Sequence, residues 1–361
     1  MNVCFINNIP SPHVIDLFNY INKNSEINVE VIYLSSISEN RNCDIANLKH
    51  QNIILSDNKI RRSFFIINLN YLKIFKKLND KNTIYIITGY GNIIFQLIMY
   101  YFIITKKKWI LWGERPKLKR VLFKKILFYP LKKTKAIIGI GSYAARIYRD
   151  IMSKPSYNLP YIIDIERYLK IDRSNRNYNQ VRFMYCGSLI HSKGVDLLAT
   201  AFIKLRERYD YIEMLLIGDG KLKENIKKII PKPFISSFRF FDFIPYNNLH
   251  EYYEMGDVFV FPTRYDGWGV VINEAMASGM PVITTYDCGA SFDLILESYN
   301  GFLCPTNNLD CLINKMEFFL INRKAINYMG NAARNTAKNL LSLPNALKNF
   351  EWIMNEVKGN D

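Results

Sequence analysis

The sequence contains few of the residues that build metal sites and disulfide frameworks. Six cysteines and four histidines are scattered over 361 residues, and no two cysteines form a C-x-x-C pair. This spacing argues against a zinc site and against a disulfide-stabilised secreted domain. We therefore expect a protein of the reducing cytoplasm, with no metal bound by cysteine or histidine.

Long apolar runs are also missing. The run Ile93–Ile104 has twelve residues, whereas a helix that spans a bilayer needs about 20. It is predicted to be a buried helix or a helix that lies in a membrane interface. The N-terminus has no basic segment followed by a long apolar one, so a signal peptide is not expected.

Acidic residues are outnumbered by basic ones. The chain has 48 Lys and Arg against 32 Asp and Glu, a net charge of +16, and its 49% hydrophobic and 22% charged residues exclude a disordered or fibrous chain. The segment Lys106–Lys135 holds twelve basic residues and one acid, Glu114, so it carries eleven of the sixteen net charges. Such an excess indicates an anionic partner.

Aromatic residues interleave with this basic segment: Trp109, Trp112, Phe123, Phe128 and Tyr129. We interpret Lys106–Lys135 as a docking surface for anionic lipid, which would place the protein peripherally at the inner face of the membrane. A solvated basic face is one alternative. A nucleic-acid-binding protein is another, although the sequence has no recognisable nucleic-acid module, so nucleic acid is not the expected partner.

Short apolar runs alternate with helical patterns along most of the chain. Strands are predicted at Val3–Ile6, Val29–Tyr33, Ile53–Leu55, Thr83–Thr88, Lys108–Trp112, Ala136–Ile140, Phe183–Cys186, Glu213–Ile217, Arg239–Phe243, Val258–Phe261 and Pro281–Thr284. This alternation is typical of α/β domains with doubly wound, Rossmann-like parallel sheets. The polar segment Lys170–Gln180 is expected to link two such domains, residues 1–170 and 181–340, facing each other across a ligand cleft. A last helix within 341–361 either caps the second domain or returns to the first.

The segment Asp257–Thr285 carries the strongest functional pattern. A buried strand leads into a loop with glycines at 267 and 269, and a helix is predicted from about Val270 to Ser278. The first-turn amides of that helix have no intrahelical acceptors, so they form an anion site. The two glycines let a phosphate approach the backbone closely.

Two carboxylates flank this anion site. Asp266 stands in the loop, and Glu274 follows eight positions later on the helix, about 5–8 Å below its start. At that depth a carboxylate can accept both hydroxyls of a ribose whose diphosphate lies at the helix start. Asp266 would then face the transferred group. A capping Asp and a surface Glu would explain each residue taken singly.

Two other strand ends carry candidate residues. Lys193 lies between a strand that ends at Gly187 and a helix that starts near Val195, where it can neutralise a phosphate at the carboxyl edge of a sheet. A solvated loop lysine is the alternative. The segment LLIGDGKL repeats the strand-to-glycine pattern, with Gly218 and Gly220 as positions of close approach.

In this order and spacing, the segments GSLIHSKGVDLL, IGDGKL and FIPYNNLHEYYEMGDVFVFPTRYDGWGVVINEAMASGMPVI resemble the retaining nucleotide-sugar glycosyltransferases of family 4 (glycosyltransferase group 1), which have the GT-B fold. The match covers about residues 181–305. The N-terminal half resembles the family more loosely, through INNIPSPHVIDLFNYI and NLPYIIDIERY.

The resemblance implies roles for the matching residues. The donor site would consist of Gly187, Ser188, Lys193, Gly218, Gly267, Trp268, Gly269, Val270 and Glu274. Lys193 and the amides of residues 267–270 would hold the diphosphate, and Glu274 would bind the ribose. Asp266 would contact the donor sugar near the reacting carbon, so Asp266, Glu274 and Lys193 are the residues expected to carry catalysis.

The sequence departs from the family pattern at three positions. Asp266 replaces the usual Glu and is one methylene shorter, which changes the sugar contact. Ser188 replaces a frequent Arg, so the diphosphate would depend more on Lys193 and the helix start, with Arg264 as a further candidate. On the acceptor side, Glu114 stands where many members have a His. His13 lies near the cleft in this fold, although a solvent-exposed histidine is the simpler interpretation.

The implied activity is transfer of a hexosyl or N-acetylhexosaminyl group, with retention, to a lipid-linked or surface-glycan acceptor, as in O-antigen, capsule or lipopolysaccharide synthesis. A UDP-sugar is the first expectation for the donor and a GDP-sugar the second. The sequence has no Asp-x-Asp pair, which argues against a metal-dependent GT-A architecture, and no cofactor is expected. The negative charge on the leaving diphosphate would instead be stabilised by the N-terminus of the helix and by Lys193.

A rival pattern lies in the first half of the chain. Gly139–Ala144 follows a predicted strand, opens a helix and precedes Asp164 by about twenty residues, as in dinucleotide-binding oxidoreductases. It stands at the end of the first α/β half rather than at its first strand. Ser142 as an ordinary helix N-cap would explain the same residues.

Overall fold

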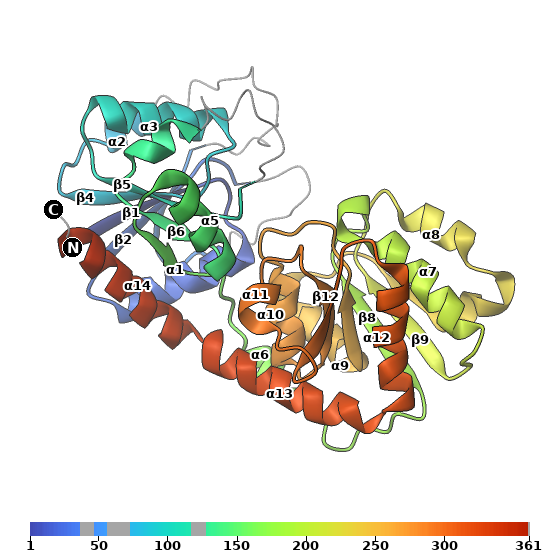
Figure 1. Ribbon diagram of the computed structural model, residues 1–361. Helices are drawn as coiled ribbons and strands as arrows, with labels where there is room; N and C mark the ends of the chain where they lie inside the picture. The colour runs from blue at the N-terminus through green and yellow to red at the C-terminus, as the bar shows by residue number, and fades with distance from the viewer. Residues whose placement is uncertain (37–46, 56–72, 117–127, 360–361) are drawn as a thin grey trace. The chain divides into compact units, whose positions relative to one another are not determined.

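The computed structural model describes residues 1–36, 47–55, 73–116 and 128–359. Contacts divide the chain into two compact units. The first unit consists of residues 1–163 together with 343–361, and the second of residues 164–342 (Figure 1). Each unit has its own parallel sheet with helices packed around it.

The first unit contains a parallel sheet that, over the described residues, has the order β3-β2-β1-β4-β5-β6-β7. Its strands are β1 (Asn2–Asn7), β2 (Asn28–Tyr33), β3 (Gln51–Ile54), β4 (Thr83–Ile87), β5 (Trp109–Gly113), β6 (Ile137–Gly139) and β7 (Ser156–Asn158). The described helices are α1 (Pro12–Asn24), α2 (Lys73–Lys77), α3 (Ile93–Ile104), η3 (Pro130–Lys133), α5 (Ser142–Met152) and α14 (Leu343–Gly359). Strands buried on both faces read as continuous apolar runs, which is why the sequence predicts most of them.

The second unit has a parallel sheet of order β10-β9-β8-β11-β12-β13. Its strands are β8 (Val181–Cys186), β9 (Ile212–Ile217), β10 (Phe238–Phe241), β11 (Val258–Phe261), β12 (Val282–Thr285) and β13 (Gly301–Cys304). Its helices are α6 (Glu166–Leu169), η4 (His191–Lys193), α7 (Val195–Arg206), α8 (Lys223–Ile229), η5 (Lys232–Ser237), η6 (Tyr246–Asn248), α9 (Leu249–Met255), α10 (Val270–Ala277), α11 (Ser291–Leu294), α12 (Leu309–Ile321) and α13 (Lys324–Leu340). The strand order reverses its direction between β8 and β11. Ligands of such sheets bind at this switch point.

The last helix, α14, belongs to the first unit. It packs beside α1, and Figure 1 draws it in dark red along that part of the unit. Phe350 is fully buried, with its ring centroid 5.7 Å from that of Phe5 on β1. The side chain of Trp352 is 52% exposed and meets Tyr157 edge-on. The sequence leaves open whether the last helix caps the second domain or returns to the first, and in the structure it packs on the first unit.

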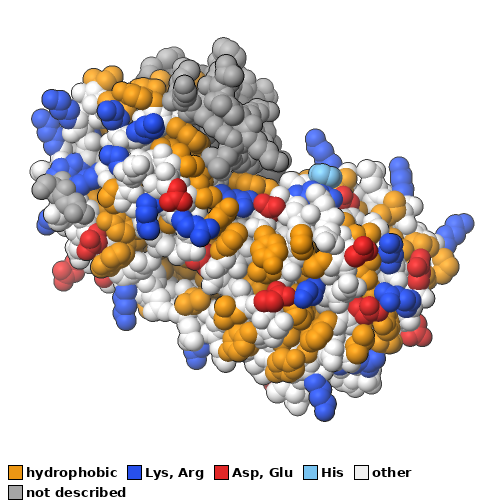
Figure 2. All heavy atoms as spheres, in the orientation of Figure 1, with side chains coloured by type: hydrophobic (Ala, Val, Ile, Leu, Met, Phe, Trp, Pro, Cys, Tyr) orange, Lys and Arg blue, Asp and Glu red, His pale blue; other side chains and the backbone are white. Residues whose placement is uncertain are grey.

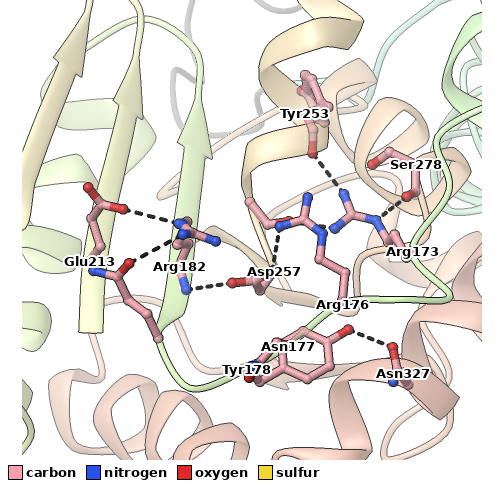
Figure 3. A network of polar contacts seen from close by, with 12 residues as sticks. Arg173, Arg176, Asn177, Tyr178, Arg182, Glu213, Tyr253, Asp257, Ser278 and Asn327 are labelled. Carbon is pink, nitrogen blue, oxygen red and sulfur yellow. Dashed lines mark hydrogen bonds and ion pairs between the residues drawn. The ribbon is translucent and has the colours of Figure 1, made fainter. Parts of the chain in front are cut away.

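The segment Lys170–Gln180 differs from the linker that the sequence predicts, because it packs against the second unit. Arg173 is buried, and its guanidinium donates to the carbonyls of Ser278, Gly256 and Tyr253 at 2.5–2.7 Å (Figure 3). Arg176 pairs with the buried Asp257 at 3.2 Å. The boundary between units instead falls at residues 163 and 164. A polar composition indicates a linker only where the polar groups face water, and here they bond to the domain.

The apolar run Ile93–Ile104 forms helix α3, whose inner face packs on the core of the first unit. The expectation of aromatics on a basic surface is largely wrong for the described residues. Trp109, Trp112 and Phe128 are buried in the core, and only Tyr129 of the described aromatics in Lys106–Lys135 is exposed. Residues 117–127, with Phe123, lie outside the described part of the chain. Among the described residues no helix is long and apolar enough to cross a bilayer.

Candidate functional site

The predicted donor residues gather at the carboxyl edge of the second sheet. Gly187 directly follows β8, and its amide donates to the carbonyl of Ile217 at the end of β9 (3.0 Å). Gly218 follows β9, and a Cβ added to it would lie 2.1 Å from the carbonyl oxygen of Gly187. These two strand ends therefore touch backbone to backbone, which requires glycine at 218. Ser188, the next residue after Gly187, is exposed at this edge.

Lys193 and Asp266 form an ion pair at the same edge. Lys193 Nζ lies 2.6 Å from Asp266 Oδ2, and both side chains are about four-fifths buried. The loop after β11 is positioned for this contact, because the amides of Arg264 and Tyr265 donate to the carbonyl of Ser192. Two residues 73 positions apart in the sequence thus form an ion pair close to the N-terminus of helix α10.

Helix α10 begins beside this ion pair. Its N-cap, Gly269, has a left-handed backbone (φ 94°), which an L side chain rarely adopts, and an added Cβ would lie 2.6 Å from Cys288 Sγ. The first helical residue, Val270, is half-buried. Amides in the first turn of a helix have no intrahelical acceptor, so α10 offers donors to an anion next to Lys193.

Glu274 lies on α10 and is not a surface residue, so one of the two interpretations left by the sequence is wrong. Its side chain is 4% exposed, and its Oε2 accepts a hydrogen bond of 2.6 Å from the hydroxyl of Tyr253 on α9. Burial raises the pKa of the Glu274 carboxyl from its ordinary value of 4.5 to about 7, while the hydroxyls of Tyr253 and Tyr168 and the charge of Arg167 lower it. The group can therefore gain or lose its proton near neutral pH.

Arg264, the further candidate cation, is paired within the second unit, and its contact with a diphosphate stays a prediction. Its guanidinium binds the Asp196 carboxylate in a bidentate manner at 2.6 and 2.9 Å, and it also donates to the carbonyl of His191 and to Asn307. Asp196 stands in the first turn of α7. Arg264 thus ties the loop after β11 to the loop and helix after β8, which keeps Lys193 and Asp266 together.

Trp268 also differs from the expectation of a donor contact. Its side chain is 1% exposed, and its indole N–H donates to Asn273 (3.1 Å). Its backbone amide donates to Asp266 Oδ1 at 3.3 Å. Gly267, just before it, is buried under Gly289, whose added Cβ would lie 2.0 Å from the Gly267 carbonyl oxygen. Residues 267 and 268 therefore shape the loop before α10, and a contact of their amides with a diphosphate stays a prediction.

The two acceptor-side candidates stand at the carboxyl edge of the first sheet. His13 is in the first turn of α1, which follows β1, and Glu114 is exposed directly after β5. Strand β4 separates β1 from β5. His13 is half-buried rather than solvent-exposed, since its Nε2 lies 3.2 Å from Ser11 Oγ and its ring packs on Tyr161 at 4.3 Å. A role in acceptor binding stays a prediction for both residues.

The rival dinucleotide pattern, Gly139–Ala144, forms the connection between β6 and α5 in the first unit. Gly139 ends β6, a strand near the edge of the sheet, between β5 and β7. The N-cap of α5 is Gly141, so the expectation that Ser142 caps this helix is wrong by one residue. A dinucleotide site of this type is expected at the switch point of the sheet, where β6 does not lie.

The sequence did not indicate Tyr253 or Asp196, which hold Glu274 and Arg264. Tyr253 stands in the run HEYYEM, where helical periodicity predicts a buried aromatic but not the partner of its hydroxyl. Asp196 resembles an ordinary acidic residue in a first helical turn. Such partners are set by tertiary packing, and a single sequence carries no signal for them.

Known glycosyltransferases match part of this chain in sequence. The family described as glycosyl transferases group 1 matches residues 167–336. An uncharacterised glycosyltransferase of Haemophilus influenzae is 32% identical over 143 residues, which cover 37% of this chain and 40% of the relative. A sulfoquinovosyl transferase of Arabidopsis thaliana is 29% identical over 209 residues, covering 55% and 38%. The chain spans about two fifths of the length of these relatives.

The likeness to solved structures extends over both units. HepE of Anabaena, solved in complex with UDP, superposes with a TM-score of 0.76 at 13% identity and covers 99% of this chain and 100% of its own. At this identity the likeness establishes the fold, which is two parallel-sheet α/β domains. Residues 167–336 of the second unit thus match the glycosyl transferases group 1 family, and the two parallel-sheet domains have the GT-B fold.

Proposed function

We propose that the protein is a glycosyltransferase that takes a sugar from a nucleotide diphosphate donor held at the carboxyl edge of the second sheet. The ion pair of Lys193 and Asp266 beside the start of α10 carries this proposal. A cation and free helix amides match a diphosphate, and the neighbouring carboxylates match sugar hydroxyls. The family match over residues 167–336 supports the same activity.

Each group has a part in the proposed reaction. The bond between the anomeric carbon and the diphosphate oxygen breaks, and a hydroxyl oxygen of the acceptor bonds to that carbon. The acceptor proton leaves to the departing diphosphate or to solvent. Lys193 and the first amides of α10 stabilise the charge that grows on the diphosphate. Asp266 orients the sugar and Glu274 accepts the ribose hydroxyls. We further propose retention of configuration and no metal requirement.

A UDP-sugar is the first candidate donor and a GDP-sugar the second. The UDP complex of HepE, a protein of the same fold, favours uridine. The relatives named above include an enzyme that transfers sulfoquinovose, so the family match does not favour one sugar. For the acceptor we propose a lipid-linked or surface glycan, as in the synthesis of O-antigen, capsule or lipopolysaccharide. The location at the inner face of a membrane stays a prediction.

A donor panel tests this proposal. UDP-, GDP- and ADP-sugars are compared by the thermal shift that each produces, and the best donor is then assayed for release of its nucleoside diphosphate and for a glycosylated product. Asp266→Asn should abolish transfer while the protein stays folded. The proposal fails if no nucleotide sugar shifts the unfolding temperature, or if Asp266→Asn turns over at nearly the wild-type rate.

A further inference from the structure

Helix α3 is apolar on its outer as well as its inner face. Its buried side chains include Phe95, Ile98 and Phe102. The outer face presents Leu97, 39% exposed, and Ile104, 79% exposed, seven positions and two helical turns apart. A helix that is apolar all round is normally buried on all sides or inserted in lipid. Over the described residues, the side chains of Leu97 and Ile104 remain exposed on this face although both are apolar.

Tyrosines extend this apolar face toward η3. Tyr100, half-buried on α3, stacks on Tyr129 with ring centroids 6.4 Å apart, and Tyr129 is 49% exposed. Leu97, Ile104 and Tyr129 are three of the six exposed large hydrophobic side chains described in the first unit. Tyrosine, with an apolar ring and a polar hydroxyl, is enriched at the boundary between lipid and water.

Lysines border this surface. Lys106 and Lys108 follow the end of α3, and Lys132 and Lys133 end η3; all four side chains are exposed. Lys133 Nζ lies 5.8 Å from the ring centroid of Tyr129. The stretches 93–108 and 128–135, which form the surface, contain no acidic residue. In Figure 2, orange and blue side chains lie together over the part of the first unit where Figure 1 places α3.

We propose that this face, made by Leu97, Tyr100, Ile104 and Tyr129 with Lys106, Lys108, Lys132 and Lys133 around it, docks on an anionic lipid bilayer. The apolar side chains enter the boundary between headgroups and acyl chains, and the lysines remain among the phosphates. Charge identifies the partner, since exposed lysines beside the apolar side chains complement anionic headgroups, and the two stretches that form the face contain no acidic residue. The proposal differs from the expectation for Lys106–Lys135 as a whole, because most of the described aromatics there belong to the core.

Vesicle sedimentation tests the docking face. The full chain is mixed with vesicles of phosphatidylcholine alone or of phosphatidylcholine with phosphatidylglycerol. We expect binding to the anionic vesicles only. Lys132→Gln with Lys133→Gln should weaken binding about 25-fold, at about fivefold per cation. Leu97→Ser with Ile104→Ser should weaken it about tenfold or more. The matched controls, Ile321→Ser and Lys227→Gln with Lys228→Gln in the second unit, should bind like the wild type.

Several results would overturn this inference. These are equal binding to both kinds of vesicle, unchanged binding of either double variant, or an equal loss in the controls. A lower unfolding temperature of Leu97→Ser with Ile104→Ser would show that another part of the chain covers the face, and it too would contradict docking. Titration of UDP into the same variants separates this test from the proposed function, because the donor site lies in the other unit and its affinity should not change.

Discussion

Glu274 is a carboxylate surrounded by tyrosines. The Tyr253 hydroxyl is hydrogen-bonded to it, and the groups of Tyr168, Arg167 and Cys186 also face it. Lys193 and Asp266, by contrast, neutralise each other. Glu274 and the Lys193–Asp266 ion pair are therefore expected to respond differently to pH and to substitution. Glu274 is sensitive to pH, and the ion pair is sensitive to the loss of either charge.

Glu274→Gln separates binding from folding. The raised pKa of Glu274 means that its ionised form destabilises the fold, and this cost is largest above about pH 7. A neutral amide avoids it, so the variant should unfold at the wild-type temperature or higher at pH 8. Its affinity for the nucleoside diphosphate should nevertheless fall about 10- to 100-fold, because the amide oxygen is a weaker acceptor for the ribose. Calorimetric titration measures this, with the exposed Glu251→Gln on α9 as control. Unchanged affinity would exclude the ribose contact.

Tyr253→Phe tests the pH dependence. Donor affinity in the wild type should rise as the pH increases through about 7, since only the ionised Glu274 accepts both ribose hydroxyls. Removing the Tyr253 hydroxyl removes a hydrogen bond that lowers this pKa, so the rise should move to higher pH. Affinity measured from pH 5.5 to 9 follows the shift, and the neighbouring Tyr252→Phe should leave the profile in place. An unshifted profile would mean that Tyr253 is merely a packing residue.

At the scale of the elements, two segments position the candidate donor site. The loop after β11 bonds to the carbonyl of Ser192, and Lys170–Gln180 bonds through Arg173 to the carbonyls of Ser278, Gly256 and Tyr253. The strands and α10 were predictable because doubly wound sheets leave continuous apolar runs with glycines at their ends. Two edge strands, β7 and β13, were missed, because β7 (SYN) is polar at both ends and β13 (GFLC) begins with glycine, so neither stands out as an apolar run. Segment Lys170–Gln180 was misread as a linker, since composition does not show that Arg173 bonds inside the domain.

Arg173→Met tests this packed segment. The change leaves the buried carbonyls of Ser278, Gly256 and Tyr253 without their donor, which should cost about 3–5 kcal/mol. Urea unfolding of the second unit measures the loss. Arg239→Met removes an exposed guanidinium 3.8 Å from Glu213, and Glu213 keeps its partner Arg182 at 3.2 Å, so this change should cost less than about 1 kcal/mol. An equal loss in the free energy of unfolding for the two variants would show that Lys170–Gln180 is a linker that does not stabilise the second unit.

At the scale of the whole molecule, the two units have separate chemistry. The second has the paired charges and the helix start proposed for the donor, and the first has the apolar face with lysines proposed for lipid. The sequence predicted the fold class, and the candidate residues Lys193 and Asp266 that it named lie together in the structure. It could not predict which charged side chains pair with each other, as the partner of Arg264 shows.

Chelation tests the proposed reaction as a whole. Because Lys193 and the start of α10 are expected to stabilise the leaving diphosphate, EDTA should leave the rate of transfer unchanged. The rate is measured with the best donor, with and without added Mg²⁺ or Mn²⁺. Strong inhibition that either metal reverses would mean that a cation takes part in holding the diphosphate.

Calorimetric titration of UDP and GDP into the wild type and three variants tests the donor site most directly. We predict that wild type binds one of the two nucleotides and that Lys193→Ala weakens it about 10- to 100-fold. The exposed Lys204→Ala serves as control. Asp266→Asn should bind at least as tightly as wild type although it no longer transfers sugar, because Lys193 is released from its ion pair. The account is contradicted if neither nucleotide binds, if Lys193→Ala binds like wild type, or if Asp266→Asn loses as much affinity as Lys193→Ala.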